Sequence, residues 1–190
     1  MIFVKKMPTL FRREFNRSDV TIFNEVTLGC EWVLEGEGKA TLKTDGACCA
    51  IINGIFYKRY DAKNGKPIPE DAILCQAEGD AVTGHIPCWR PVTDATEDKW
   101  FRIAKENSGF TEDGTYEAVG PKFNANPEGL NDNTLIKHGD NLLEVERSFE
   151  GIKMFLEKNR IEGIVFWREN GDRVKIKRSD FGFEWVKKTR

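Results

Sequence analysis

Residues 43–46 contain a lysine, an aspartate and a glycine that could together act on a phosphate group. Lys43 is followed two positions later by Asp45 and then by Gly46. A lysine amine becomes a nucleophile when it loses its proton, which neighbouring cations or partial burial favour. A metal ion near Asp45 would add positive charge, and Gly46 lets the backbone approach a ligand closely. Taken alone, the same pattern is typical of a solvent-exposed strand end followed by a glycine turn.

A hairpin is predicted directly after these residues. Asn53-Gly54 lies between two apolar runs, which is a strong signal for a two-residue turn. The arms of this hairpin are predicted at 47–52 and 55–60, and a preceding strand at 39–44 carries Lys43. Lys43 is therefore expected near the end of a strand.

Two later stretches place more charged side chains on predicted strands. Glu117 lies in a strand over 115–120, and Glu162 begins a strand over 161–168 that turns at Asn170-Gly171. On the return strand, Lys175 and Lys177 share one face because side chains alternate with period two. Each feature alone also fits exposed strand carboxylates or edge lysines that prevent aggregation.

The remaining pattern predicts an α+β fold with antiparallel hairpins and few helices. Amphipathic helices are predicted over 98–107, with Thr96 as N-cap, and over 148–158. Further strands are predicted at 30–34, 72–76 and 89–92, a strand or extended arm at 2–15, and an irregular loop at 121–133. The length of 190 residues predicts one domain over 1–190.

Composition excludes several classes of protein. The net charge is −2, so the whole surface is not that of a DNA-coating protein, although local Lys and Arg clusters allow a basic groove. The five cysteines form no Cys-x-x-Cys pair and there are only two histidines, which argues against a zinc site. Cys48 and Cys49 are expected to face opposite sides of a strand. With no signal peptide and no apolar run of membrane-spanning length, we expect a cytoplasmic protein.

The order of the charged stretches resembles that of a known superfamily. Lys43, Glu117, Glu162 and the Lys175–Lys177 pair follow one another as motifs I, III, IV and V do in covalent nucleotidyltransferases. These are the ATP-dependent DNA and RNA ligases and the mRNA capping enzymes. Arg59 falls where these enzymes keep the arginine of motif Ia.

A closer resemblance is to the single-domain 5′–3′ RNA ligase family known from vertebrates. It extends from about residue 39 to residue 185 and includes the two adjacent cysteines after Gly46. Leu42 is a departure, because RNA ligases often carry a glutamate at that position to read the adenine amine. The stretches that carry the resemblance are residues 84–92, 119–129, 138–139, 160–166 and 181–185.

The resemblance implies an antiparallel nucleotidyltransferase domain of the ATP-grasp-like ligase adenylation type. In that family Lys43 would attack the α-phosphate of ATP to form lysyl-AMP, and the AMP would pass to an RNA 5′-phosphate before joining to a 3′-hydroxyl. Lys175 and Lys177 would contact the α-phosphate and would also depress the pKa of Lys43. Asp45 and Glu162 would hold Mg²⁺, or Mn²⁺ in its place.

The same resemblance assigns the remaining nucleotide contacts. Glu117 would contact the ribose or the metal shell, and Arg59 the ribose or a phosphate. His138 is the candidate to stack on adenine, with Phe123 second. The partners would be RNA ends, held mainly through phosphates in the manner of an RNA repair enzyme. A monomer is expected.

Three alternatives remain at the level of the sequence. DNA ligases and capping guanylyltransferases share the lysine chemistry but carry an oligonucleotide-binding barrel after motif V, for which no room is expected between Lys177 and Arg190. A non-catalytic nucleotide- or RNA-binding module is the second alternative. An adenylyltransferase for another phosphorylated acceptor is the third.

Overall fold

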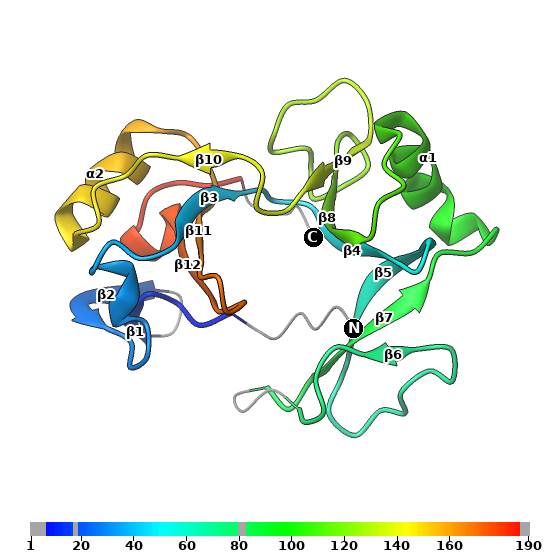
Figure 1. Cartoon of the computed structure of the whole chain (residues 1–190), viewed down its shortest axis with the longest axis horizontal. Helices are drawn as coiled ribbons and strands as arrows, with labels where there is room; N and C mark the ends of the chain where they lie inside the picture. The colour runs from blue at the N-terminus through cyan, green and yellow to red at the C-terminus, as the bar shows by residue number, and fades with distance from the viewer. Residues whose placement is uncertain (1–6, 17–18, 80–82, 187–190) are drawn as a thin grey trace. The chain divides into compact units, whose positions relative to one another are not determined.

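A computed structural model describes residues 7–16, 19–79 and 83–186 (Figure 1). Its contacts divide the chain into two compact units. Unit 1 includes the described residues of 45–138, and unit 2 includes those of 7–44 and 139–186. The chain therefore enters unit 1 between Thr44 and Asp45 and leaves it between His138 and Gly139. The expectation of a single domain over 1–190 stays a prediction.

Unit 1 is built on a six-stranded antiparallel sheet of order β6-β7-β5-β4-β8-β9. The predicted hairpin joins β4 to β5, and both turn residues adopt left-handed conformations, with φ of 51° at Asn53 and 76° at Gly54. The six strands are β4 (Ala47–Ile52), β5 (Ile55–Ala62), β6 (Ile73–Leu74), β7 (Ile86–Pro91), β8 (Gly114–Val119) and β9 (Thr134–Lys137).

Helix α1 (Lys99–Ser108) packs beside β9 and β8 and covers one face of this sheet (Figure 1). The 3₁₀ helix η2 (Thr96–Asp98) precedes it, so the N-cap is Asp98 and the prediction of Thr96 was wrong. Gly109 ends the helix with φ of 69°. The buried residues on this side are Cys49, Ile51, Phe56, Ala104, Tyr116, Ala118, Phe123 and Leu135.

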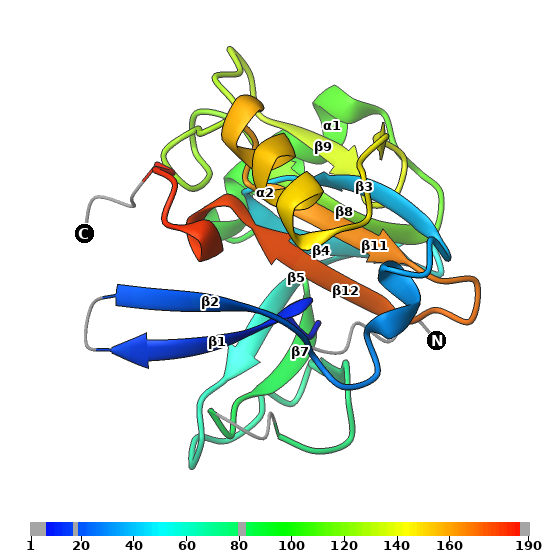
Figure 2. The same ribbon diagram turned by 90° about the vertical axis from the view of Figure 1, so that its left-hand side faces the viewer.

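Unit 2 contains a four-stranded antiparallel sheet of order β10-β3-β11-β12 and a separate β1–β2 ribbon (Figure 2). The predicted second hairpin joins β11 to β12. Its elements are β1 (Phe11–Asn16), β2 (Asp19–Val26), η1 (Glu31–Val33), β3 (Lys39–Lys43), β10 (Leu142–Leu143), α2 (Phe149–Lys158), β11 (Gly163–Trp167), β12 (Arg173–Lys177) and η3 (Arg178–Phe181).

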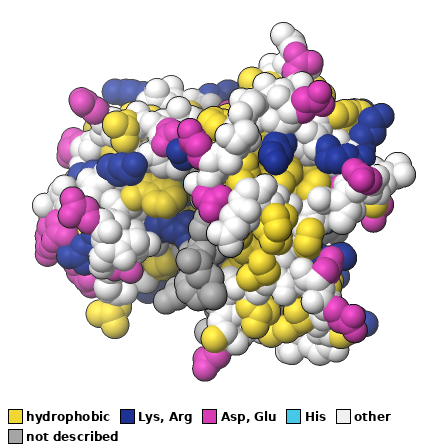
Figure 3. Space-filling view, turned by 45° about the vertical axis from the view of Figure 1, so that its right-hand side comes forward, with side chains coloured by type: hydrophobic (Ala, Val, Ile, Leu, Met, Phe, Trp, Pro, Cys, Tyr) yellow, Lys and Arg dark blue, Asp and Glu magenta, His cyan; other side chains and the backbone are white. Residues whose placement is uncertain are grey.

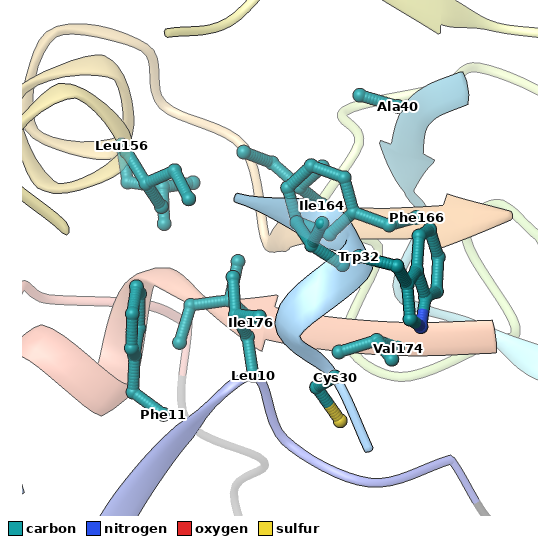
Figure 4. Packing of buried hydrophobic residues seen from close by; sticks show 12 residues of the cluster. Leu10, Phe11, Cys30, Trp32, Ala40, Leu156, Ile164, Phe166, Val174 and Ile176 are labelled. Atoms are coloured by element: carbon teal, nitrogen blue, oxygen red, sulfur yellow. The ribbon is translucent and has the colours of Figure 1, made fainter. Parts of the chain in front are cut away.

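The core of unit 2 lies between α2 and the four-stranded sheet (Figure 4). Leu156 comes from α2, Ile164 from β11 and Ile176 from β12, and all three are fully buried. The predicted helix begins where expected, because the Ser148 side chain accepts a hydrogen bond from the Gly151 amide at 3.0 Å. This core fixes the register of β3 and β12, which carry Lys43 and the paired lysines, and of β11, which begins directly after Glu162.

Two predicted strands differ from the structure. Residues 30–34 contain the 3₁₀ helix η1, because Cys30, Trp32 and Val33 are all buried and adjacent strand residues cannot face one core together. Strand β7 begins at Ile86, earlier than the predicted 89–92. The prediction of an α+β fold with mostly antiparallel sheets is confirmed. Among the described residues, none of the helices has the length and apolar character needed to cross a membrane.

Candidate functional site

Lys43 and Glu162 form an ion pair in unit 2. Strands β3 and β11 run antiparallel with Lys43 opposite Gly163, so Glu162 lies beside the end of β3. Lys43 Nζ donates to Glu162 Oε2 at 2.7 Å, with 19% of the lysine side chain and 9% of the glutamate side chain exposed. Gly163 permits this arrangement, because a Cβ there would lie 2.2 Å from the Ile176 carbonyl oxygen. The structure thus brings together two residues that are far apart in sequence.

Strand β12 adds two cations to the same unit. Lys177 pairs with Gly163 and Lys175 with Val165 across the β11–β12 ladder. Burial, followed by the positive charges of Lys177, Lys43 and Arg13, lowers the pKa of Lys175 from 10.5 to about 8, against a smaller opposing effect of Asp180. Positive charge therefore exceeds negative charge around Lys175. We call Lys43, Lys175 and Lys177 the lysine cluster.

Two residues near the lysine cluster were missed by sequence reasoning. Asp180 is 4% exposed, and its carboxylate accepts from Arg13 at 2.8 Å and from the Lys177 backbone amide at 2.9 Å. It therefore fixes the end of β12 and holds Arg13 near Lys175. The only sequence signal was the basic pair at positions 12 and 13, which a solvated surface explains equally well.

Glu117 and His138 form a hydrogen-bonded pair in unit 1. Glu117 Oε1 accepts from the Gly46 amide at 3.0 Å, and its Oε2 lies 2.9 Å from His138 Nε2. The other imidazole nitrogen, Nδ1, lies 3.0 Å from the Thr115 hydroxyl. Gly46 is needed here, because a Cβ would lie 2.2 Å from the Ala118 carbonyl oxygen. Three predicted site residues, Gly46, Glu117 and His138, are thus in direct contact.

Asp45 is held by a loop with an unusual backbone. Asn124 donates from its side-chain amide to Asp45 Oδ1 at 2.9 Å and also to the Gly46 carbonyl. Residues Asn124, Ala125 and Asn126 have φ of 45°, 60° and 53°, a left-handed run that costs free energy at each non-glycine position. The sequence indicated a polar loop here but not this contact with Asp45.

Arg59 and Phe123 have other surroundings. Arg59 donates to Asp61 at 2.8 Å on the same strand, and its guanidinium carbon lies 6.0 Å from the centroid of the Trp89 ring. Phe123 is 6% exposed, and its ring meets that of Phe101 edge-on with centroids 5.2 Å apart. Phe123 is therefore part of the unit 1 core.

Charged side chains of both signs are mixed on the surface. Figure 3 shows Lys and Arg interspersed with Asp and Glu on the face that it views, with hydrophobic side chains exposed among them. This mixture agrees with the net charge of −2.

Comparison with known proteins gives one coarse result. No protein-family model matches the chain. A curated protein of Pongo abelii, RNA ligase 1, is 29% identical over 167 residues, which cover 67% of this chain and 47% of that protein. The chain thus spans about half the length of this relative. The similarity, distant as it is, supports a relationship to RNA ligases.

Proposed function

We propose that this protein is an ATP-dependent RNA ligase that joins a 5′-phosphate to a 3′-hydroxyl through lysyl-AMP and RNA-adenylate intermediates. The observation that carries the proposal is the Lys43–Glu162 pair at 2.7 Å, next to Lys175 and its depressed pKa. A lysine with a carboxylate partner and surplus cations nearby is suited to attack an anionic substrate. The similarity to RNA ligase 1 supports the choice of RNA.

In the first step, Lys43 Nζ attacks the α-phosphorus of ATP. A P–N bond forms, the α–β phosphoanhydride bond breaks, and pyrophosphate leaves. Glu162 lies within hydrogen-bond distance of Nζ and is placed to accept its proton. Lys175 and Lys177 would stabilise the negative charge on the phosphate oxygens, which is the main task of a protein in phosphoryl-type transfer.

The family resemblance proposes Asp45 and Glu162 as the carboxylates that would hold Mg²⁺, an ion that prefers oxygen ligands and keeps several of its waters. When bound, Mg²⁺ or Mn²⁺ would supply positive charge to the phosphates. Glu117 fits this role less well, since its neighbours Cys48 and His138 offer sulfur and nitrogen. We therefore assign Glu117 to the ribose.

The remaining contacts follow the family resemblance. His138 would stack on adenine while its ring is held by Thr115 and Glu117. Arg59 would contact a phosphate or the ribose. The second and third steps transfer AMP to an RNA 5′-phosphate and expel it when the 3′-hydroxyl attacks.

The experiment that tests this function is labelling with each α-labelled nucleoside triphosphate and Mg²⁺, followed by denaturing electrophoresis. We expect label from ATP and not from GTP. Label from GTP alone would assign the capping class, and label from neither would assign a binding module. Sealing of matched RNA and DNA strands at near-physiological salt then tests the substrate, because phosphate contacts mask sugar selectivity at low salt. Equal sealing of both would contradict the RNA assignment.

A further inference from the structure

We propose that Cys48, Glu117 and His138 form a binding site for a zinc-type divalent cation, with three protein ligands and an open fourth position. Their sulfur, oxygen and nitrogen atoms all lie within 4.8 Å of one another. Thiolate, carboxylate and imidazole are the three ligand types that Zn²⁺ accepts, and three protein ligands with an open fourth position are found in zinc sites that bind a water or a substrate.

Sheet register places these residues on one face of unit 1. Cys48 lies opposite Glu117 in the antiparallel β4–β8 pair, and Glu117 lies opposite Ile136 in the β8–β9 pair. His138 follows Ile136 by two positions, and its amide donates to the Thr115 carbonyl at 3.0 Å, which continues the ladder. The convergence therefore depends on three strands and could not be read from residue spacing, which had argued against zinc.

The distances suit a tetrahedral ion after small adjustments. Zinc bonds of roughly 2.0 Å to nitrogen or oxygen and 2.3 Å to sulfur separate tetrahedral ligands by about 3.3 to 3.6 Å. Glu117 Oε2 and His138 Nε2, now 2.9 Å apart, would open by a few tenths of an ångström. A separation at the upper limit of 4.8 Å would close by roughly 1.2 to 1.5 Å, which side-chain rotation supplies.

The surroundings already orient two of the three ligands. The Thr115 hydroxyl lies at Nδ1 of His138, which leaves Nε2 toward Glu117. The Gly46 amide donates to Oε1 of Glu117, which leaves Oε2 toward His138. Partners of this kind hold metal ligands in place, and their removal typically weakens metal binding by about 10- to 100-fold.

Exposure distinguishes Cys48 from the other cysteines, all of which the structure describes. Cys30, Cys49, Cys75 and Cys88 are buried, whereas Cys48 is partly exposed. Glu117 and His138 are also partly exposed. A cation could therefore reach all three ligands from solvent. The sulfur and nitrogen ligands favour Zn²⁺ over Mg²⁺, which prefers oxygen.

Occupancy of this site would have a regulatory consequence that rests on the proposed function. Glu117 and His138 are the residues assigned to the ribose and adenine of ATP. A bound zinc ion would engage both side chains, and Zn²⁺ would therefore compete with ATP and inhibit adenylylation.

The binding test uses the full chain, freed of metal by a chelator, and requires no nucleotide. We expect Co²⁺ to give a thiolate-to-cobalt charge-transfer band, and Zn²⁺ to displace it with a stoichiometry of one. Cys48→Ser should remove the band and weaken zinc affinity, measured against a chromophoric chelator, by more than tenfold. The matched control Cys30→Ala removes a thiol from unit 2 and should leave both readouts unchanged.

Two outcomes would overturn the proposal. A cobalt complex of the unmodified protein without a thiolate band excludes Cys48 as a ligand, whether or not the variant folds. Zinc affinity that is equal in the unmodified protein and in Cys48→Ser excludes the site as well.

The regulatory consequence has its own readout. Zn²⁺ should inhibit ATP labelling of the unmodified protein and inhibit Cys48→Ser at least tenfold less strongly. Equal inhibition of both proteins would overturn the regulatory role. A complete lack of ATP labelling would overturn the proposed function and leave the metal-binding result standing, so the two failures are distinguishable.

Discussion

Two lysine–carboxylate pairs in this protein look alike but have different surroundings. Lys43–Glu162 lies in unit 2 and Lys58–Asp98 in unit 1, and about a fifth of each lysine side chain is exposed. Both acidic residues are buried, because only 7% of the whole-residue surface of Glu162 and 2% of that of Asp98 is exposed. Burial and ion pairing therefore do not by themselves distinguish a reactive lysine from a structural one.

The surroundings of the carboxylates make the distinction. Asp98 also accepts from the Thr93 amide at 2.8 Å and from the Thr93 hydroxyl at 3.1 Å, at the start of α1. Burial alone would raise the pKa of Asp98, but hydrogen bonds from Lys58 and Thr93 outweigh it and hold the pKa below its usual value. Lys58 and Thr93 thus supply hydrogen bonds to the buried Asp98 carboxylate, as expected of a structural ion pair.

The Lys43–Glu162 pair is instead part of the lysine cluster. Burial is the largest cause of the lowered pKa of Lys175, about 8, and the positive charges of Lys177 and Lys43 contribute to it. A surplus of positive charge costs stability in the absence of a ligand and becomes favourable when a polyanion binds. We infer that surplus charge beside an ion pair, rather than the pair itself, indicates the reactive lysine.

The largest expected effect is the difference in ATP labelling between the alanine variants of Lys43 and Lys58. Lys43→Ala should lower ATP labelling by on the order of 10⁴-fold or more, because it removes the proposed nucleophile. The matched variant Lys58→Ala should retain labelling but lose about 3 kcal/mol of stability, because it leaves Asp98 buried without its cation. Labelling is measured by electrophoresis and stability by urea unfolding. Retained labelling in Lys43→Ala, or its loss in folded Lys58→Ala, would contradict the distinction.

An intermediate effect is expected from neutralising the carboxylates with amides of equal size. Glu162→Gln keeps an acceptor for Lys43 but removes the charge, and adenylylation should fall by roughly 10²- to 10³-fold. Asp98→Asn should leave adenylylation within a few-fold of the unmodified protein and cost about 2 kcal/mol of stability. Single-turnover labelling rates and urea midpoints separate the two results. Equal loss of activity in both variants would assign Glu162 and Asp98 the same role.

Structural features that depend on neighbouring residues could be predicted from the sequence. Asn53-Gly54 and Asn170-Gly171 marked both hairpins, because turn chemistry depends on neighbouring residues, and the amphipathic periodicity of residues 148–158 marked α2. Alternation also placed Lys175 and Lys177 together on β12. The resemblance to ligases drew attention to Lys43 and Glu162, and the β3–β11 register shows why these two meet.

Contacts between distant segments could not be predicted. Asp180 holding Arg13 and Asn124 holding Asp45 both depend on tertiary structure, and a single sequence contains no signal for such pairs. The 3₁₀ helix at Glu31–Val33 was missed because a short apolar run fits a strand equally well. The convergence of Cys48, Glu117 and His138 could not be predicted either, because strand register rather than sequence spacing brings them together.

The smallest expected effect concerns stability and its pH dependence at Lys175. The pKa of Lys175 is about 8 in the folded protein against 10.5 ordinarily, so between these values the unfolded chain binds more protons and stability rises with pH. Below pH 8 the lysine is charged in both states, and the unfavourable burial of its charge is fully present. Lys175→Met removes this buried charge and should raise the free energy of unfolding at pH 7 by about 2 kcal/mol, after allowance for solvent screening at a partly exposed site.

The same variant should lose the part of the stability gain between pH 8 and 10.5 that comes from Lys175, while adenylylation falls because a cation beside the phosphate is gone. Urea unfolding at pH 7, 8, 9 and 10 measures the first effect and labelling measures the second. Lys137→Met is the control, since Lys137 pairs with the exposed Glu112 at 3.1 Å and its loss should change stability by less than about 1 kcal/mol. A Lys175→Met protein that is less stable at pH 7, and whose stability has an unchanged pH dependence, would show that burial of the Lys175 charge is not unfavourable. The lysine cluster would then resemble the Lys58–Asp98 pair, and surplus charge could no longer distinguish Lys43, the proposed nucleophile, from Lys58.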